Sequence, residues 1–286
     1  MPLSKTRVAA ELLRILPRKR VSQALGMLAD LPVPTSVLDQ LTGVYIKAYN
    51  VDLSEAEVPE GGFASFNSFF TRRLHPGSRP LDQDATALLS PADGRIEDCG
   101  PIERGATFRV KGKLYDVGEL LGDSSIAHRY DGGLFSIVYL SPRDYHRVHA
   151  PVAGKVSEAR YVGGTLYPVN AIGAHVPRLF ARNERVVVHQ NSLLHGDVVS
   201  ILVGAVGVGR IGIAFDEELV TNVGKAPVVH TYGDDGPYID RGDELGVFYL
   251  GSTVILLTEA RAKWKLVTAA GDSVRMGQAL ARKVAV

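Results

Sequence analysis

The chain contains 286 residues, of which 45% are hydrophobic and 22% charged, and its formal net charge is +1. This length and composition are typical of a soluble globular protein with one large domain, or one domain plus an appendage. The near-zero charge excludes a general attraction to nucleic acid. The single cysteine, Cys99, excludes an internal disulfide and indicates a reducing compartment.

No apolar run is long enough to cross a membrane as a helix. The longest, residues 198–209, is rich in glycine and ends at Arg210, whereas a spanning helix needs roughly 20 apolar residues. Glu11 and Arg14 interrupt the apolar positions near the N-terminus, which excludes a secretory signal. We therefore expect an intracellular protein that does not span a membrane.

The first 75 residues are predicted to be helical. Val8, Leu12, Ile15 and Leu16 follow the spacing of one helix face, and Pro17 should end or kink that helix. Further helices are expected over residues 20–30, from Thr35 or Ser36 as N-cap to about Tyr49, and over residues 66–74 with Ser65 or Asn67 as N-cap.

The first of these segments is strongly basic. A basic amphipathic helix either packs on its own domain with a solvated basic face or lies on an anionic membrane surface. The pattern alone leaves both interpretations open. Against a single acidic residue, Glu11, the segment carries Lys5, Arg7, Arg14, Arg18, Lys19 and Arg20.

From residue 80 onward, short β-branched segments alternate with glycine-rich turns, which is typical of a strand-dominated domain. With the helices before it, this pattern predicts an α+β fold: an N-terminal helical region over residues 1–75, then a β-rich domain of sandwich or barrel type over residues 76–286. The predicted strands cover residues 134–140, 185–188, 198–208, 246–250, 254–258 and 265–269.

This domain contains an internal echo. Residues 91–96 and 151–156 both read Pro-x-x-Gly-basic-β-branched. Two such turn-to-strand units predict quasi-repeated halves, with a chance match of six residues as the alternative. Asp93, inside the first unit, is either part of a common Asp-Gly turn or a carboxylate that orients a histidine.

Two histidines, His146 and His149, follow the predicted strand over residues 134–140. On a helical turn they would share a face, and on an extended segment they would point apart. A metal site would need a third ligand, and none with convincing spacing is nearby. Structural and catalytic roles both remain open at this point.

Gly251 and Ser252 stand between two predicted strands. The plain interpretation is a glycine bend or bulge with a polar corner. The chemical interpretation is attack by the serine hydroxyl on the carbonyl of the preceding residue, where glycine relieves crowding because it lacks a Cβ. Such an attack needs a base and oxyanion donors. Elimination and loss of ammonia would then leave a pyruvoyl group, an electron sink like pyridoxal phosphate.

Together these segments resemble the bacterial, pyruvoyl-dependent phosphatidylserine decarboxylase proenzymes. Residues 250–253 match the Leu-Gly-Ser-Thr hallmark, residues 90–94 the aspartate motif, and residues 145–151 the YHRVH-x-P motif. Residues 66–74 (FNSFFTRRL) and 180–186 (FARNERV) are similar to two further family elements. The resemblance spans residues 66–258, and the first 60 residues are similar only as basic amphipathic helices.

The resemblance implies a reaction and a set of roles. Phosphatidylserine would be converted to phosphatidylethanolamine and CO2 after autocatalytic serinolysis at Gly251-Ser252, through a Schiff base between the pyruvoyl ketone and the substrate amine, with no pyridoxal phosphate and no metal. Asp93, His149 and Ser252 match the autocatalytic triad, with His149 as base and Asp93 as its orienter. Gly251 carries the attacked carbonyl, and His146 matches the histidine that contacts substrate and assists decarboxylation.

The resemblance also implies partners and a location. Cleavage would give a β chain of residues 1–251 and an α chain of residues 252–286, which stay together, with a homodimer as a further assembly. The substrate would lie in an anionic membrane, and no nucleic acid would bind. Because a phospholipid is reached at a membrane, the resemblance favours the interfacial interpretation of the basic helices and a peripheral location on the cytoplasmic face of the inner membrane.

Two other classes of protein compete with this interpretation. Residues 207–212 fit the G-x-G-x-x-G pattern of a dinucleotide-binding loop, but residues 213–215 are a poor helix start in a strand-rich region. The Pro-x-x-Gly units are also similar to those of lipoyl and biotinyl carrier domains. Lys155 would then be the modified lysine, although it lies inside the unit rather than at a hairpin tip.

Overall fold

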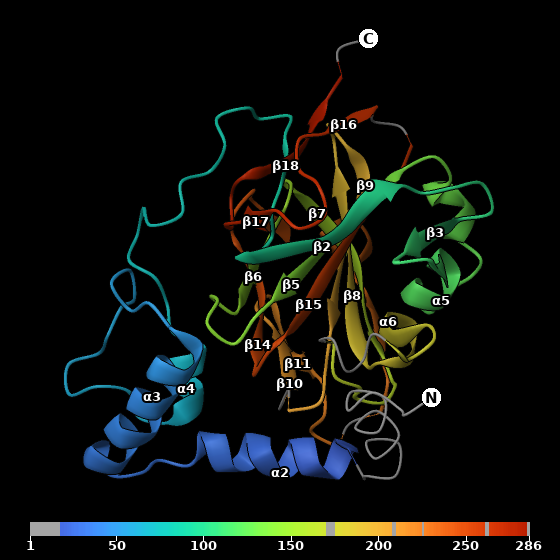
Figure 1. The fold of residues 1–286 in the computed structure, drawn as a ribbon. Helices are drawn as coiled ribbons and strands as arrows, with labels where there is room; N and C mark the ends of the chain where they lie inside the picture. Colours follow the sequence, from blue (N-terminus) through green and yellow to red (C-terminus); the bar gives the residue numbers. More distant parts are fainter. Residues whose placement is uncertain (1–17, 170–174, 208–209, 225, 261–262, 285–286) are drawn as a thin grey trace, which may run out of the picture.

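The computed structural model describes residues 18–169, 175–207, 210–224, 226–260 and 263–284 (Figure 1). The predicted helix before Pro17 lies outside these residues. The helices are α2 (Arg18–Asp30), α3 (Thr35–Tyr49), α4 (Phe66–Phe70), α5 (Val117–Leu121) and α6 (Leu179–Arg182), with short 3-10 helices η1 (Ala127–Tyr130) and η3 (Gly233–Asp235).

Most strands belong to two antiparallel sheets. The larger is a 9-stranded sheet. Its order is β12 (Val229–Thr231), β7 (Gly154–Val162), β8 (Arg185–Ser192), β9 (Gly196–Val203), β15 (Ser252–Thr258), β5 (Leu134–Leu140), β2 (Gly94–Pro101) and β17 (Ser273–Val274), with β13 (Tyr238–Ile239) also paired to β7. The 4-stranded sheet has the order β11 (Asp216–Val220), β10 (Arg210–Ile213), β14 (Glu244–Tyr249) and β6 (Arg147–His149).

Two smaller sheets complete the domain. The 3-stranded sheet joins β1 (Leu88–Leu89), β18 (Ala279–Lys283) and β16 (Trp264–Leu266), and the 2-stranded sheet joins β3 (Thr107–Val110) and β4 (Lys113–Asp116). A helical region followed by these sheets confirms the predicted α+β class.

The central strands of the larger sheet (β5, β8, β9 and β15) are buried on both faces, which explains their continuous apolar runs. Alternate side chains of a strand point to opposite faces. In β15, Val254 and Leu256 therefore enter the core shared with the 4-stranded sheet, while Ile255 and Leu257 enter a second core beneath α5 and α6. All four side chains are 0% exposed, so β15 is a central strand of the molecule.

The Pro-x-x-Gly echo marks two matching halves of the larger sheet. Gly94 begins β2 and Gly154 begins β7. In each half a two-residue strand pairs with the glycine and the basic residue after it, β17 in one and β13 in the other. Both strands also shift register at the same distance from the glycine. The halves, β17-β2-β5-β15 and β13-β7-β8-β9, meet where β15 pairs with β9, which confirms the expected quasi-repeat.

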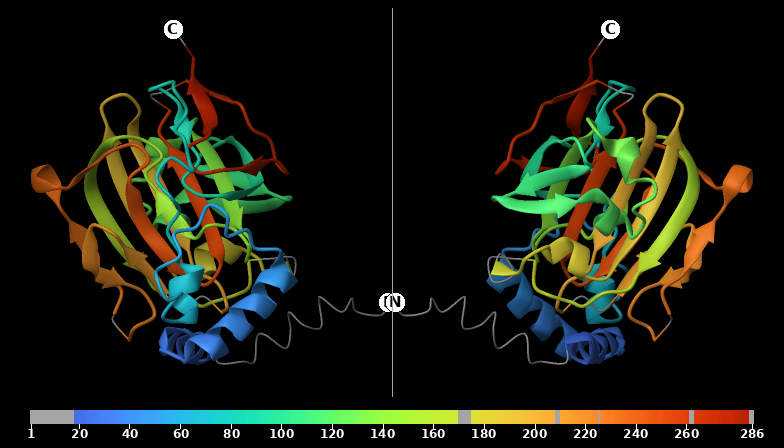
Figure 2. Two further views of the ribbon diagram at one scale, coloured as in Figure 1. Left: turned by 90° about the vertical axis from the view of Figure 1, so that its left-hand side faces the viewer. Right: turned by 90° about the vertical axis from the view of Figure 1, so that its right-hand side faces the viewer.

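Helices α2, α3 and α4 gather at one end of the sheets, away from the C-terminus (Figures 1 and 2). Hydrogen bonds and ion pairs fasten α2 there. Gln23 donates to the Asn222 carbonyl, and the Ser22 hydroxyl accepts from the Gly207 amide. Asp30 pairs with Arg210, and Lys19 pairs with Glu184. Helix α4 contacts both α2 and α3. The helical region thus packs against the β-rich part through polar contacts and a small aromatic core.

Several predicted boundaries were wrong. Helix α3 begins at Thr35 with Pro34 at its N-cap and no side-chain cap, because proline already fixes the backbone angle that starts a helix. Helix α4 ends at Phe70, four residues early, with Ser65 as its cap in a capping box. The last predicted strand, residues 265–269, is β16 and ends at Leu266. Strand 134–140 is confirmed as β5.

Candidate active site

The Gly251-Ser252 bond lies at a corner between the two large sheets. Strand β14 belongs to the 4-stranded sheet and β15 to the 9-stranded sheet, so the chain changes sheet across Leu250 and Gly251. Both have positive φ, 82° at Leu250 and 23° at Gly251. A branched residue in that region costs about 1–3 kcal/mol and persists only where the surroundings impose it. The predicted bend is confirmed, and it is a strained one.

An apolar cavity of about 790 Å3 borders this corner. Its walls come from α2, α3 and α4 and from the corner itself. Representative lining residues are Leu25, Leu41, Tyr45, Phe66, Phe70 and Leu250, together with Gly251. The bond predicted to be cleaved is therefore adjacent to a cavity whose apolar lining suits a hydrocarbon chain.

His146 lies behind one wall of this cavity. Its ring packs against that of Phe70, with 4.1 Å between centroids, and Phe70 lines the cavity. Nδ1 lies 2.8 Å from the Asp144 carbonyl, while buried Nε2 has no partner. Complete burial lowers the pKa of His146 to about 3. His146 is therefore a neutral imidazole with Nδ1 as donor and Nε2 as an unused acceptor.

His149 is held at both ring nitrogens. Nδ1 lies 2.8 Å from the Gly242 carbonyl, and Nε2 lies 3.1 Å from the Tyr145 hydroxyl. Because a carbonyl can only accept, Nδ1 carries the proton and Nε2 accepts from Tyr145. Burial lowers the pKa of His149. This is the neutral tautomer that a general base requires.

Asp93 is clamped by an arginine. Its carboxylate accepts from Arg79 Nε at 2.8 Å, from Arg79 Nη2 at 2.6 Å and from the Met276 amide at 2.9 Å. Arg79 also binds Glu55. The His149 amide donates to the Pro91 carbonyl at 2.7 Å, so the two motifs lie side by side, but Asp93 makes no hydrogen bond to the His149 ring. The orienting role of Asp93 remains a prediction.

Three residues of this site were not predicted from the sequence. Arg79 lies in a loop without a recognisable pattern. Tyr145 is the first residue of the YHRVH-x-P motif, but the motif assigns it no role. Arg72 was part of the FNSFFTRRL segment with no role, yet it lines a second cavity of about 310 Å3 together with Asp93 and Tyr145. The only sequence feature that pointed to Arg72 was its position within the FNSFFTRRL segment.

The structure tests the metal interpretation of the histidines. In the described part of the chain, no three His, Cys, Asp or Glu side chains come together as metal ligands would. His146 and His149 each direct Nδ1 to a different backbone carbonyl. The arrangement is that of two separate imidazoles.

The dinucleotide-loop interpretation is wrong. Residues 210–213 form strand β10, which pairs with β11 and β14. A phosphate-binding loop of this class needs a helix at that point. Val208 and Gly209 themselves lie outside the described residues.

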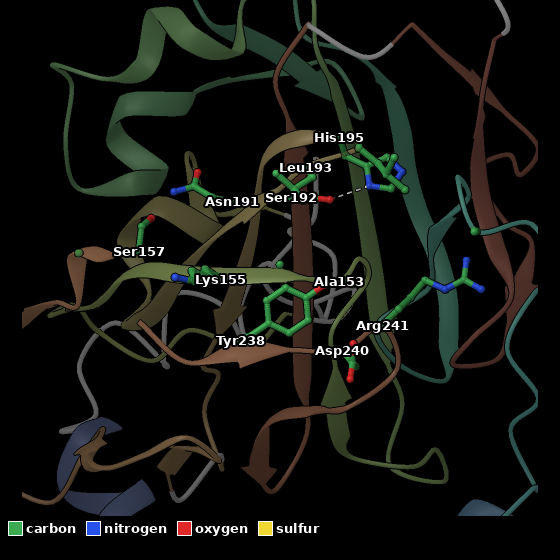
Figure 3. Close-up of a pocket in the computed structure, with 14 residues that line it drawn as sticks. Ala153, Lys155, Ser157, Asn191, Ser192, Leu193, His195, Tyr238, Asp240 and Arg241 are labelled. Atoms are coloured by element: carbon green, nitrogen blue, oxygen red, sulfur yellow. Dashed lines mark hydrogen bonds between the residues drawn. The ribbon is translucent and has the colours of Figure 1, made fainter. Parts of the chain in front are cut away.

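The proposed carrier lysine, Lys155, lies near the start of β7 rather than at a hairpin tip. It lines a hollow of about 850 Å3 between that strand and the turn after β8. Figure 3 shows Lys155 on one side of this hollow, with Ser192 and His195 hydrogen-bonded above it. None of the predicted site residues lines it, so it is distinct from the corner at Gly251.

Comparisons with known proteins agree with the motifs. The sequence model of the family described as phosphatidylserine decarboxylase matches residues 66–282. Three relatives bear the name phosphatidylserine decarboxylase proenzyme. The protein of Myxococcus xanthus is 41% identical over 270 residues, covering 94% of this chain and 95% of the relative. That of Brevibacillus brevis is 40% identical (96% and 97% covered), and that of Bordetella avium 42% identical (93% and 91% covered).

These matches show that the chain is a member of a family of carboxy-lyases. The chain belongs to the phosphatidylserine decarboxylase family. Across the described residues, no helix combines the length and the apolar character needed to cross a membrane.

Proposed function

We propose that this chain cleaves itself at Gly251-Ser252 and, with the pyruvoyl group so formed, decarboxylates phosphatidylserine to phosphatidylethanolamine. One observation carries the proposal: Leu250 and Gly251 line the apolar cavity enclosed by α2, α3 and α4. The bond that would yield the cofactor thus shares its surroundings with a space for acyl chains. The names of the relatives support the same substrate.

In the cleavage step, the Ser252 hydroxyl attacks the Gly251 carbonyl carbon. His149 accepts the hydroxyl proton at Nε2 and returns it to the departing Ser252 nitrogen, which converts the amide to an ester. Tyr145 must first leave Nε2, to which it is hydrogen-bonded at 3.1 Å. The Gly242 carbonyl keeps Nδ1 protonated throughout. Loss of the Ser252 α-proton then expels the Gly251 carboxylate and leaves dehydroalanine, which water converts to a pyruvoyl group and ammonia.

The residues around the corner fit such a group. A pyruvoyl ketone would condense with the substrate amine and accept electrons as CO2 leaves. The neighbouring wall supplies His146, whose unpartnered Nε2 can accept a hydrogen bond from the head group. The apolar cavity would accommodate the acyl chains.

The two chains would remain together after cleavage. Strand β15, which begins the α chain, pairs with both β5 and β9, and its side chains from Val254 to Leu257 are fully buried. Separation of the two chains would expose these side chains to water and leave β5 and β9 without the strand that pairs with both. A homodimer stays a prediction.

The N-terminal helices would dock on the membrane. An unusual number of large apolar side chains on α2 and α3 face solvent, which favours the interfacial interpretation. We propose a peripheral location on the cytoplasmic face of the inner membrane, with lipid entering the cavity from this side. The most exposed of these residues are Met27 (67%), Leu28 (63%), Leu41 (54%) and Val44 (70%).

Mass spectrometry of the purified, denatured protein tests the maturation. The expected species are residues 1–251 and a 35-residue fragment, residues 252–286, whose N-terminus is blocked to Edman degradation and reactive toward hydrazides. The same preparation should release CO2 from phosphatidylserine in mixed micelles. A single intact chain after prolonged incubation would contradict self-cleavage.

Liposome co-sedimentation tests the docking face. The double variant Leu28→Asp and Val44→Asp should lose most binding to anionic vesicles, because two charges would enter the apolar interface. The matched control is Leu193→Asp, at a turn on the other half of the sheet, where the side chain is 102% exposed. Equal binding by the double variant and the wild type would exclude this face.

A further inference from the structure

Two other largely buried arginines of this chain have hydrogen-bond acceptors around their guanidinium groups. Arg185 is 2% exposed, and its guanidinium donates to the carbonyls of Leu120, Ala181, Asn183 and Glu119. The side chain of Arg79 is 8% exposed and binds the carboxylates of Asp93 and Glu55. Both guanidinium groups are therefore held in place by acceptors of the protein itself.

Arg72 is different. It is 5% exposed, its Nη2 donates to the Arg143 carbonyl at 3.1 Å, and its guanidinium lies 5.7 Å from the centre of the Phe69 ring. Its buried Nε has no partner, and it forms no ion pair with any carboxylate of the described residues. Burial lowers the pKa of Arg72, yet an arginine remains charged at neutral pH. Within the part of the chain that the structure describes, Arg72 thus has no direct ion pair and, unlike Arg185, no acceptor for its buried Nε. A buried guanidinium left unsatisfied in this way is costly, which favours a ligand at this place.

Arg72 faces the place where the head group would lie. It lines the cavity of about 310 Å3 beside Asp93 and Tyr145, and its positive charge contributes to the lowered pKa of His146. Phe70, two residues earlier, lines the apolar cavity with Gly251. The side chain thus stands behind the wall of the acyl-chain cavity, on the side of His146.

A short stretch of chain also connects Arg72 to the cleavage corner. Arg143, whose carbonyl receives its hydrogen bond, lies three residues beyond Leu140, which pairs in register with Ser252. Three residues span at most about 10 Å, so the loop that holds Arg72 starts beside residue 252. The unpartnered Nε of Arg72 and the unpartnered Nε2 of His146 would border the polar end of a ligand attached at residue 252.

We propose that Arg72 binds an oxyanion of the serine head group, either its carboxylate or its phosphodiester. The inference rests on the proposed function. The planar guanidinium suits both anions because it presents parallel N–H donors to two oxygens at once. Exclusion of water strengthens such a contact. Bound substrate would supply the anion that this buried cation lacks.

The test compares neutral variants of Arg72 with a neighbouring control. Arg72→Gln and Arg72→Met remove the charge, and Met keeps an apolar stem suited to a buried position. Arg73→Gln removes the same charge one residue along, where the side chain is 65% exposed. Each variant is first checked for cleavage into two chains, then assayed for the KM of phosphatidylserine and the Ki of phosphatidylethanolamine in mixed micelles.

The expected rise in KM is about 10- to 100-fold for whichever Arg72 variant matures, the usual loss for a charged hydrogen bond, while Arg73→Gln stays within about twofold. If Arg72 binds the carboxylate, the Ki of phosphatidylethanolamine, which lacks that group, will not change. If it binds the phosphodiester, KM and Ki will rise together. Wild-type KM and Ki in a matured Arg72 variant would overturn the inference. Failure of the wild type itself to turn over phosphatidylserine would instead overturn the proposed function.

Discussion

The two halves of the large sheet share a frame but differ at the position where chemistry is proposed. Gly94 and Gly154 occupy the same place in the halves, and a short strand pairs with each in the same register. The residue before the glycine is Asp93 in one half and Ala153 in the other. Each half also has a cavity at this place, one lined by Asp93 and Gly94, the other by Ala153 and Gly154 (Figure 3).

The connections differ as well. Strands β8 and β9 are joined by a tight turn, with Ser192 paired to Gly196. Strands β5 and β15 are paired in the same way, Leu140 with Ser252, but the chain between them passes through the whole second half. The returning chain must therefore enter β15 from another sheet, which produces the strained corner at Gly251. The two halves thus share one strand arrangement, and the long connection between β5 and β15 produces the corner at the candidate site.

The largest expected effect concerns Ser252. Ser252→Ala removes the attacking hydroxyl, so the protein should remain one chain and release no CO2. Ser192→Ala, at the end of β8 in the second half, serves as the matched control and should mature normally. Denaturing electrophoresis and mass spectrometry check both. Any 35-residue fragment from Ser252→Ala would show that the hydroxyl is dispensable.

His149→Ala should slow cleavage by about 10²–10⁴-fold, the usual contribution of a general base. The second half offers His195→Ala as its control, because His195 is also buried and hydrogen-bonded to a backbone carbonyl. Cleavage is followed in precursor freshly refolded from denaturant. Equal rates for the two variants would remove His149 from the role of base.

The same assay has a predicted pH dependence. The pKa of His149 is lowered from its ordinary value of 6.5, so the imidazole stays neutral, and able to accept a proton, to a lower pH than a free histidine would. The cleavage rate should hold as pH falls to 6.5 and decline only below it. A half-maximal rate above pH 6.5 would contradict the buried, neutral form.

A smaller effect is expected from Asp93→Ala, which copies the second half into the first. The Gly242 carbonyl already fixes the His149 tautomer, so cleavage should slow less than in His149→Ala. Stability should fall by about 3 kcal/mol, because Arg79 loses a buried partner. The reciprocal Ala153→Asp should leave the cleavage rate unchanged. If Asp93→Ala cleaves at the wild-type rate, Asp93 has no part in cleavage and serves only to bind Arg79.

Local patterns account for what could be predicted from the sequence. The strand over residues 134–140 and the Gly251 bend each depend on a few adjacent residues. The echo of residues 91–96 at 151–156 also signalled the two halves. Arg79 could not be predicted, because only the fold brings it to Asp93. Nor could the hydrogen bond between His149, at the end of β6, and Gly242, in the turn before β14, because 93 residues separate them in the sequence. The helix before Pro17 stays a prediction.

The smallest expected effects come from the two equivalent glycines. A Cβ on Gly94 would lie 2.3 Å from the Tyr139 carbonyl oxygen, and one on Gly154 would lie 2.6 Å from that of Asn191. Because both contacts are with backbone, each substitution to alanine should cost about 1–3 kcal/mol. Gly43→Ala, where a Cβ would meet nothing within 4 Å, is the control and should not destabilise the protein. Chemical unfolding in the Ser252→Ala background measures all three as single chains.

With Ser252 intact, Gly94→Ala and Gly154→Ala should differ in their rates of cleavage. Gly94→Ala displaces Asp93 and the strand facing β5, so it should slow maturation. Gly154→Ala strains the half that carries no predicted site residue, so the cleavage rate should stay near that of the wild type despite an equal loss of stability. Equal slowing by both would mean that cleavage responds to the stability of the whole sheet. The first outcome would instead locate the chemistry in one half of a shared frame.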